Sequence, residues 1–189
     1  MYNREFHKSI ENDEYPQAVR IGEYISTFLR PDSFIDFGCS TGLYLREVQI
    51  RLPNIPAIGF EFSQDAVDCA LCPKVYKVDL TESLQIQKIP NTLGLCLEVL
   101  EHIEDKHWKP VLENMTKLCD KIIFSAALPG QGGTGHVNCR PKIDWIMRFH
   151  ELGWVVDLDG SRHIIDYMRQ GYHMGWFNNN AMVLIPHRN

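Results

Sequence analysis

The feature that most constrains the fold is a regular alternation of short apolar runs with longer amphipathic segments between residues 33 and 126. The apolar runs occupy residues 33–37, 57–62, 75–78, 93–97 and 121–126. Each run has the length of a strand, and strands that alternate with helices form βαβ units with a parallel sheet between helical layers. The sequence therefore predicts an α/β fold with a mostly parallel sheet and helices on both faces.

The helical segments are recognised by apolar residues spaced three and four apart. They occupy residues 15–29, 64–70, 106–119 and 141–152, and a further helical pattern runs from Gly42 to Leu52. Pro16 and Pro141 stand near two of the predicted starts, where proline is tolerated. Two late runs, 154–158 and 181–185, predict strands that complete the sheet as an antiparallel hairpin.

Size and composition are those of one ordinary globular domain. The chain has 189 residues, of which 44% are hydrophobic and 23% charged. It shows no repeat and no linker, so a single domain over residues 1–189 is expected. The 19 Lys and Arg residues against 24 Asp and Glu give a net charge of -5. This is not the basic footprint of nucleic-acid binding, so a small-molecule partner is expected.

No segment predicts secretion or membrane insertion. The first ten residues are polar and charged, and no apolar run approaches the ~20 residues of a membrane helix. The six cysteines are scattered, and the one close pair, Cys69 and Cys72, lacks the second pair that a structural zinc site needs. We therefore expect a cytoplasmic protein with reduced thiols and no membrane partner.

The turn after the first predicted strand, Gly38-Cys39-Ser40-Thr41-Gly42, is the first candidate site. In open α/β sheets, ligands bind beyond the carboxyl ends of the strands. A dinucleotide fingerprint would need glycine at the places of Ser40 and Leu43, and Asp36 would repel a pyrophosphate. Dinucleotide binding is therefore disfavoured.

The same turn also matches the nucleophile elbow of serine hydrolases, Gly-x-Ser-x-Gly, with Ser40 as the nucleophile. An α/β-hydrolase needs several strands and an oxyanion loop before the elbow, and only 37 residues precede this one. A serine hydrolase stays open as an alternative.

The spacing Asp36-x-Gly38-x-x-x-Gly42 resembles the first motif of the class I S-adenosylmethionine-dependent methyltransferases, whose sheet is Rossmann-like. The resemblance implies that Asp36, Gly38, Ser40 and Gly42 bind S-adenosylmethionine. The chemistry agrees, because a carboxylate can hold the ammonium group of this ligand and glycines let the backbone pass close to it. The N-terminus of the following helix favours the carboxylate group of the ligand.

Acidic residues also end the next two predicted strands. Glu61 is placed to accept hydrogen bonds from ribose hydroxyls, and the adjacent Phe62 to cover the adenine face. In the family that the turn resembles, the position of Asp79 and Leu80 holds the adenine amino group. The competing interpretation is that Glu61 and Asp79 are only helix caps or surface acids.

The fourth predicted strand runs into Glu98-Val-Leu-Glu101-His102. In a helical turn that starts at Glu98, the two glutamates and the histidine share a face. This segment resembles small-RNA 2′-O-methyltransferases and ubiquinone-pathway O-methyltransferases, which implies a divalent cation (Mn, Fe, Zn or Mg) held by Glu98, Glu101, His102 and His136. Two alternatives stay open. His102 or His136 acts as a metal-free general base, or Glu98 packs under the methionine moiety and the other two residues cap backbone groups.

Taken together, the resemblance implies methyl transfer from S-adenosylmethionine to a small-molecule acceptor, at oxygen. A non-catalytic module that binds the same cofactor is a second alternative. The glycine-rich segment 130–135 is either a mobile lid over the substrate or a surface loop.

Overall fold

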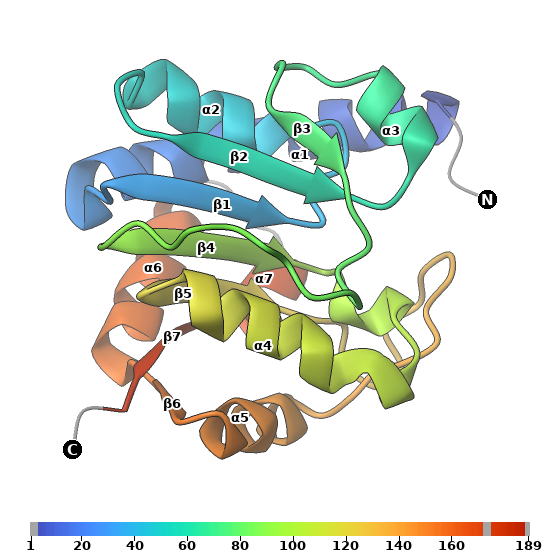
Figure 1. Ribbon diagram of the computed structural model, residues 1–189, viewed down its shortest axis with the longest axis vertical. Coiled ribbons are helices and arrows are strands. Elements are labelled where there is room, and N and C mark those ends of the chain that lie inside the picture. The colour runs from blue at the N-terminus through green and yellow to red at the C-terminus, as the bar shows by residue number, and fades with distance from the viewer. Residues whose placement is uncertain (1–3, 172–174, 188–189) are drawn as a thin grey trace.

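The computed structural model describes residues 4–171 and 175–187. They form one seven-stranded sheet in the order β3-β2-β1-β4-β5-β7-β6 (Figure 1). Neighbouring strands are parallel from β3 to β5, whereas β7 runs antiparallel to both β5 and β6. The strands are β1 Ser33–Phe37, β2 Ala57–Glu61, β3 Val75–Lys77, β4 Thr92–Leu97, β5 Lys121–Ser125, β6 Trp154–Val156 and β7 Met182–Pro186. The predicted Rossmann-like, mostly parallel sheet with a C-terminal antiparallel strand is confirmed.

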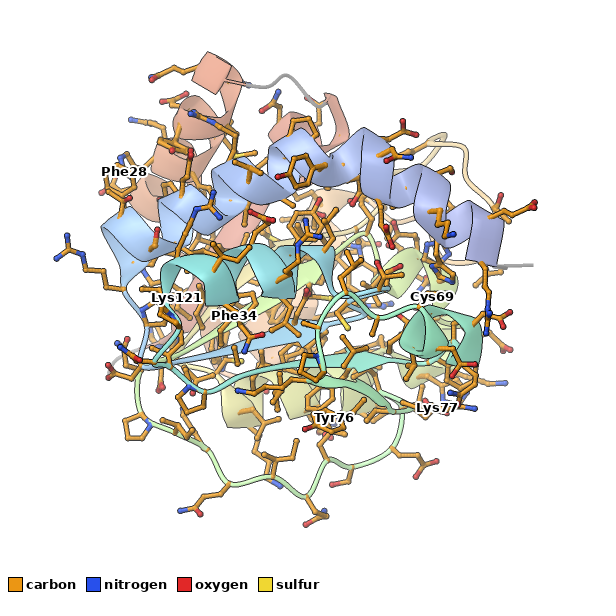
Figure 2. The ribbon with its side chains drawn as sticks, turned by 90° about the horizontal axis from the view of Figure 1, so that it is seen from above. Phe28, Phe34, Cys69, Tyr76, Lys77 and Lys121 are labelled. Carbon is orange, nitrogen blue, oxygen red and sulfur yellow. The ribbon has the colours of Figure 1, made fainter. Side chains whose placement is uncertain are left out.

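Helices cover both faces of the sheet, and α1 lies alongside α2 in the view from above (Figure 2). The helices are α1 Arg4–Tyr24, α2 Leu43–Arg51, α3 Gln64–Asp68, α4 Trp108–Leu118, α5 Lys142–Glu151, α6 Leu158–Gly171 and α7 Gly175–Asn180. Single turns of other helix types occupy Ile25–Leu29, Leu100–His102 and Asp105–His107. None of the helices in the described segments combines the length and the hydropathy of a bilayer-spanning segment.

The core has two layers because side chains alternate along each strand. On β1, Phe34 packs with residues of α1 and α2, while Ile35 and Phe37 pack with residues of α4 and α5. Asp36 lies between Ile35 and Phe37 in the sequence, so it belongs to the α1 and α2 side. This alternation places a carboxyl group in an apolar layer, next to the carboxyl end of the central strand.

Two expectations about helices were wrong. The first helix begins at Arg4 rather than at residue 15, so Pro16 lies inside it. Proline removes one intrahelical hydrogen bond, but α1 continues past it and buries Ala18 and Ile21. The predicted hairpin of residues 154–158 and 181–185 also left no helix between its two strands. The structure has α6 and α7 there, so β6 and β7 pair antiparallel without forming a hairpin.

Candidate active site

The turn between β1 and α2 has a backbone conformation that depends on glycine. Gly38, Ser40 and Gly42 have positive φ values of 75°, 50° and 80°, in the left-handed region that residues with a Cβ disfavour. A Cβ on Gly38 would lie 2.5 Å from Cγ2 of Val99, and one on Gly42 would lie 2.7 Å from Cγ2 of Val75. The turn itself therefore requires both glycines, and its backbone packs directly against the ends of neighbouring segments.

Glu61, at the carboxyl end of β2, is tied to this turn. Its Oε2 accepts a hydrogen bond from the Ser40 amide at 2.8 Å, and its Oε1 accepts one from the Ser63 amide at 2.7 Å. Each carboxylate oxygen keeps a further lone pair for a ligand hydroxyl. The Ser40 hydroxyl lies 2.8 Å from Nδ1 of His7 on α1. The turn is therefore held between β2 on one side and α1 on the other.

Asp36 is 3% exposed, and its Oδ2 has no hydrogen-bond partner among the described residues. Burial raises the pKa of Asp36 from 3.8 to about 8, with smaller contributions from the negative charges of Glu61 and Glu14. A buried carboxyl oxygen without a partner is costly. The environment of Asp36 therefore favours a ligand that brings positive charge or hydrogen-bond donors.

The other residues predicted to contact adenosine lie in different environments. Phe62 follows Glu61 and is 69% exposed, so its ring is accessible to a ligand. Asp79 is an exposed acid, its Oδ1 accepts hydrogen bonds from the amide and the hydroxyl of Thr81 in a turn, and no helix begins there. Leu80 is buried in the apolar layer with residues of α4. The adenine-binding roles of these three residues stay predictions.

Glu98 follows β4 with a φ of 52° and lies before the helical turn, which starts at Leu100. Gln131 Nε2 donates to Glu98 Oε2 at 2.5 Å, and Asn180 Nδ2 donates to the two carboxylate oxygens at 3.2 and 3.3 Å. Asn180 Nδ2 also donates to Gln131 Oε1 at 2.9 Å. We call Gln131 and Asn180 the amide clamp. No sequence pattern indicated it, since its members come from a loop and from the end of α7.

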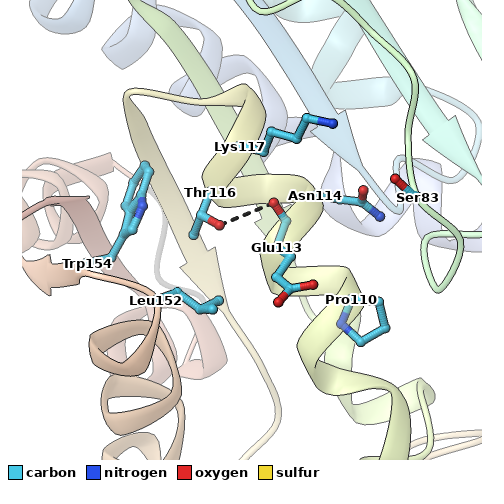
Figure 3. A pocket seen from close by; sticks show the side chains of 8 residues that line it. All are labelled: Ser83, Pro110, Glu113, Asn114, Thr116, Lys117, Leu152 and Trp154. Carbon is cyan, nitrogen blue, oxygen red and sulfur yellow. Dashed lines mark hydrogen bonds between the residues drawn. The ribbon is translucent and has the colours of Figure 1, made fainter.

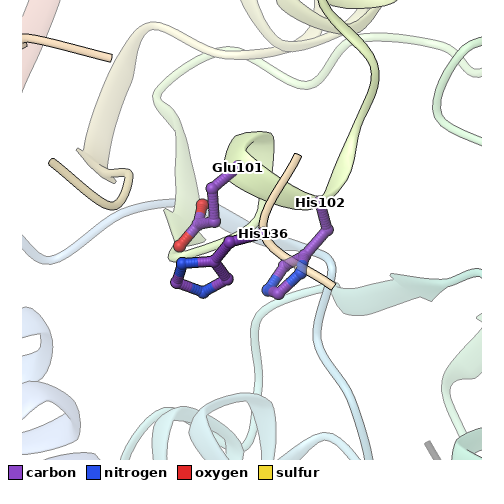
Figure 4. A group of neighbouring side chains, drawn as sticks. All are labelled: Glu101, His102 and His136. Atoms are coloured by element: carbon purple, nitrogen blue, oxygen red, sulfur yellow. The ribbon is translucent and has the colours of Figure 1, made fainter. Parts of the chain in front are cut away.

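Glu101, His102 and His136 form a group whose potential metal-ligand atoms all lie within 4.8 Å of one another (Figure 4). Glu101 is 0% exposed, and its carboxylate oxygens make no hydrogen bond of good geometry within the described residues, although the backbone of Ala127 and the carboxyl group of Glu98 lie close enough to affect its pKa. Burial, followed by the negative charge of Glu98, raises the pKa of Glu101 to about 8. One carboxylate and two imidazoles are a donor set that suits a divalent transition metal.

Backbone carbonyls hold both imidazoles through Nδ1. His102 Nδ1 lies 3.3 Å from the oxygen of Gly135, and His136 Nδ1 lies 3.1 Å from the oxygen of Gln131. A carbonyl oxygen only accepts, so each Nδ1 carries a hydrogen, and Nε2 is the nitrogen through which such an imidazole binds a metal or a proton. Burial lowers the pKa of His102. The group therefore fits a divalent cation, and it also fits a neutral imidazole base.

The glycine-rich loop after β5 brings Gln131 and His136 to the ends of the central strands. Within this loop a Cβ on Gly133 would overlap the His136 ring, whereas a Cβ on Gly132 would meet nothing within 4 Å. Gly133 therefore allows the loop backbone to pass over the imidazole. The loop predicted to be a lid or a surface loop lies against site residues here, because Gln131 also belongs to the amide clamp.

Five carboxyl groups at this end of the sheet lack a basic partner. In residues 4–171 and 175–187 none of them forms an ion pair. Their negative charges raise the pKa values of neighbouring members: Glu98 acts on Glu14 and on Glu101, and Glu14 and Glu61 act on Asp36. The buried Glu47, by contrast, forms ion pairs with Arg46 and Arg51. The five residues, called the acidic rim below, are Glu14, Asp36, Glu61, Glu98 and Glu101.

A separate groove of ≈ 440 Å³ lies between α4 and the residue that begins β6, Trp154 (Figure 3). It extends along α4 from Pro110 to Lys117, and no residue of the acidic rim lines it. Two of its polar side chains already serve the fold: Asn114 bonds to the backbone of Leu80 and Leu84, and Thr116 bonds to carbonyls of its own helix. We therefore place the candidate site at the acidic rim.

The chain resembles several solved structures over nearly its whole length. It matches the mitomycin 7-O-methyltransferase MmcR with a TM-score of 0.66 and 11% identity, over 96% of this chain and 56% of that chain. The sugar N-methyltransferase KedS8 from Streptoalloteichus sp. gives 0.65 and 12%, over 90% and 88%. The plantazolicin methyltransferase BpumL, in complex with a triazolic desmethylPZN analogue and SAH, gives 0.68 and 14%, over 98% and 91%. No family model matches the sequence, and no curated protein matches it significantly.

These similarities establish the fold. The chain has the class I fold of S-adenosylmethionine-dependent methyltransferases, so the structural side of the sequence resemblance is confirmed. The chain spans 56% of the length of MmcR and most of the length of the other two proteins.

Proposed function

We propose that the protein is an S-adenosylmethionine-dependent methyltransferase that acts on a small-molecule acceptor. The observation that carries the proposal is the acidic rim beside a glycine turn, at the strand ends where open α/β sheets bind ligands. A ligand with an ammonium and a sulfonium group supplies the positive charge that no basic side chain supplies to Asp36 and its acidic neighbours. The neighbours in fold are methyltransferases, and BpumL is bound to SAH.

Each part of the rim has a role in this proposal. Gly38 and Gly42 let the backbone approach the ligand, and the start of α2 faces its carboxylate. Glu61 accepts hydrogen bonds from the ribose hydroxyls with the lone pairs that the Ser40 and Ser63 amides leave free. Asp36 faces the ammonium end of the ligand, directly or through water.

We propose oxygen as the atom that is methylated, with His102 or His136 as the group that removes its proton. The sulfonium methyl group is already activated, so the protein has to position donor and acceptor and accept one proton. MmcR is named an O-methyltransferase and KedS8 an N-methyltransferase. A matched series of hydroxyl and amine acceptors, assayed for S-adenosylhomocysteine release, tests the choice of oxygen.

Calorimetry with S-adenosylmethionine and S-adenosylhomocysteine tests the cofactor assignment. We expect the wild type to bind both and Glu61→Gln to bind them about tenfold to hundredfold more weakly, because a charge-assisted hydrogen bond is lost. The control is Glu113→Gln, which removes the same charge from an exposed residue of α4. A wild-type protein that binds neither compound refutes the proposal, and binding without turnover on any acceptor favours a non-catalytic module.

The serine hydrolase alternative is not supported. The Ser40 amide donates to the Glu61 carboxylate, and a negative charge there would repel an oxyanion that forms beside Ser40. The overall fold agrees with the methyltransferase structures. We expect no labelling of Ser40 by a fluorophosphonate probe.

As the alternative to a histidine base, we propose that Glu101, His102 and His136 hold a divalent cation, in which case the two imidazoles bind the metal and do not remove the proton. The buried Glu101 oxygens, which make no hydrogen bond of good geometry in the described part of the chain, favour this proposal over an empty site. A bound cation would lower the pKa of an acceptor hydroxyl. Two imidazoles and one carboxylate suit Mn²⁺, Fe²⁺ or Zn²⁺ better than Mg²⁺. Glu98 lies outside this group, and its role as a further ligand stays a prediction.

Two neighbouring glycines offer a matched test of the cation site. Gly133→Ala is expected to weaken Mn²⁺ binding about tenfold to hundredfold, because the new methyl group displaces the His136 ring. Gly132→Ala is expected to bind Mn²⁺ like the wild type, because its methyl group meets open space. Mn²⁺ affinity is measured by calorimetry after treatment with chelator. Unchanged affinity in a Glu101→Gln, His102→Ala double variant would show that the cation binds elsewhere.

A further inference from the structure

The inward face of α1 carries an acid among buried residues. His7, Glu14 and Ile21 are spaced by seven residues, which is close to two helical turns, so they share one stripe of the helix. His7 and Ile21 are buried, and His7 contacts the Ser40 hydroxyl of the cofactor turn. Glu14 therefore lies on the side of α1 that faces the body of the protein.

Glu14 is held in place by its neighbours on α1 and α2. The Tyr44 hydroxyl donates to Glu14 Oε2 at 3.0 Å, and Gln17 Nε2 donates to the Tyr44 oxygen at 2.8 Å. Within residues 4–171 and 175–187, no hydrogen bond reaches the second oxygen, Glu14 Oε1. Two buried side chains thus fix the direction of one carboxylate and leave one of its oxygens for another partner.

Burying the Glu14 carboxylate costs free energy, and no basic residue in the described part of the chain forms an ion pair that would offset this cost. Burial raises the pKa of Glu14 to about 7, after which the charge of Glu98 adds to the shift. Glu14 in turn raises the pKa of Asp36. The fully buried Asp36 has an oxygen without a partner in the described chain. Negative charge among these acids of α1, β1 and the end of β4 therefore raises the pKa of Glu14 and of Asp36, and none of the three forms an ion pair within the described residues.

We propose that Glu14 binds the ammonium group of the amino-acid part of S-adenosylmethionine, so that α1 contributes a cofactor-binding residue. The inference rests on the proposed function. An ammonium group has three N–H donors and can bond to several carboxylates at once. The sulfonium group has no donor hydrogen, and the carboxylate of the ligand would be repelled. The ammonium group is therefore the part of the cofactor that matches Glu14 Oε1.

The test compares two ligands that differ only in this group. S-Adenosylhomocysteine has the ammonium group, and its deamino analogue, the adenosyl thioether of butanoate, lacks it. Glu14→Gln is expected to weaken binding of S-adenosylhomocysteine about tenfold to hundredfold. Binding of the deamino analogue, measured by the same calorimetry, is expected to change less than about twofold.

Two further variants control for the loss of a charge and for the hydrogen bond that orients Glu14. Glu5→Gln removes the same charge from an exposed position of α1 and is expected to bind both ligands like the wild type. Tyr44→Phe keeps the Glu14 charge but removes its hydrogen bond, and is expected to lower affinity for S-adenosylhomocysteine roughly two- to tenfold.

The outcomes separate this inference from the proposed function. If the wild type binds S-adenosylhomocysteine but Glu14→Gln loses nothing, or loses equal affinity for both ligands, the inference about Glu14 is wrong and the cofactor assignment stands. If the wild type does not bind S-adenosylhomocysteine, the proposed function is wrong and this inference with it.

Discussion

Gly38→Ala is expected to abolish measurable cofactor binding and to lower the free energy of unfolding by roughly 2–5 kcal/mol. Two costs add. The backbone at residue 38 has a φ of 75°, and the new Cβ would lie 2.5 Å from Cγ2 of Val99. Relief of that overlap has to move the turn at residues 38–42, which binds Glu61, or the segment after β4, which contains Glu98 and Glu101. Urea unfolding and calorimetry with S-adenosylhomocysteine measure the two effects.

Two variants separate the conformational cost from the steric one. Gly153 has a similar φ of 77°, but a Cβ there would meet nothing within 4 Å. Gly153→Ala is therefore expected to cost only about 1–2 kcal/mol and to bind cofactor normally. The double variant Gly38→Ala, Val99→Ala is expected to recover part of the lost stability, because the overlapping methyl groups are removed. A Gly153→Ala variant as damaged as Gly38→Ala would contradict the steric explanation.

Asp36→Asn is expected to flatten the pH dependence of stability of the ligand-free protein. The native pKa of Asp36 is raised from 3.8 to about 8, chiefly by burial and further by Glu61 and Glu14. Between these two values the native state keeps a proton that the unfolded state has lost. The contribution of Asp36 to stability is therefore fully present below pH 3.8 and is lost as the pH rises through about 8.

The size of the pH dependence is limited because only one proton is taken up or released. The free energy of unfolding of the wild type, relative to Asp36→Asn, is expected to fall by at most about 1.4 kcal/mol per pH unit between these limits. Urea unfolding at a series of pH values measures the difference. A cationic cofactor favours the charged carboxylate, so binding at pH 7 is expected to release protons from the wild type, and fewer from Asp36→Asn. Equal pH slopes in the two proteins would show that Asp36 does not titrate in this range.

The parts of the site that could be predicted are those formed by one short segment. The strand at 33–37 was predicted to the residue, and the turn after it contains the predicted glycines in left-handed conformation. Both depend on local properties, namely an apolar run of strand length and residues without a Cβ at a tight turn. Glu61 was predicted at a strand end for the same reason.

The segment after β4 was predicted less well. A regular helical turn from Glu98 would have placed three ligands on one face, but the turn starts at Leu100, and Glu98 has a positive φ. Glu98 is instead hydrogen-bonded to the amide clamp. Gln131 lies 33 residues and Asn180 lies 82 residues further along the chain. Contacts at such separations have no local signature, so a helical-face argument cannot include them.

The amino-acid sequence alone determined the sheet, its parallel core and the glycine turn, because these follow from hydrophobic periodicity and from the backbone freedom of single residues. Only the tertiary structure decided which polar groups surround the turn. It brought Glu14 from α1, the amide clamp from a loop and α7, and His136 to the strand ends. The physical reason is that packing of distant elements sets which buried polar groups find partners and which, such as Asp36 and Glu101, are left for a ligand.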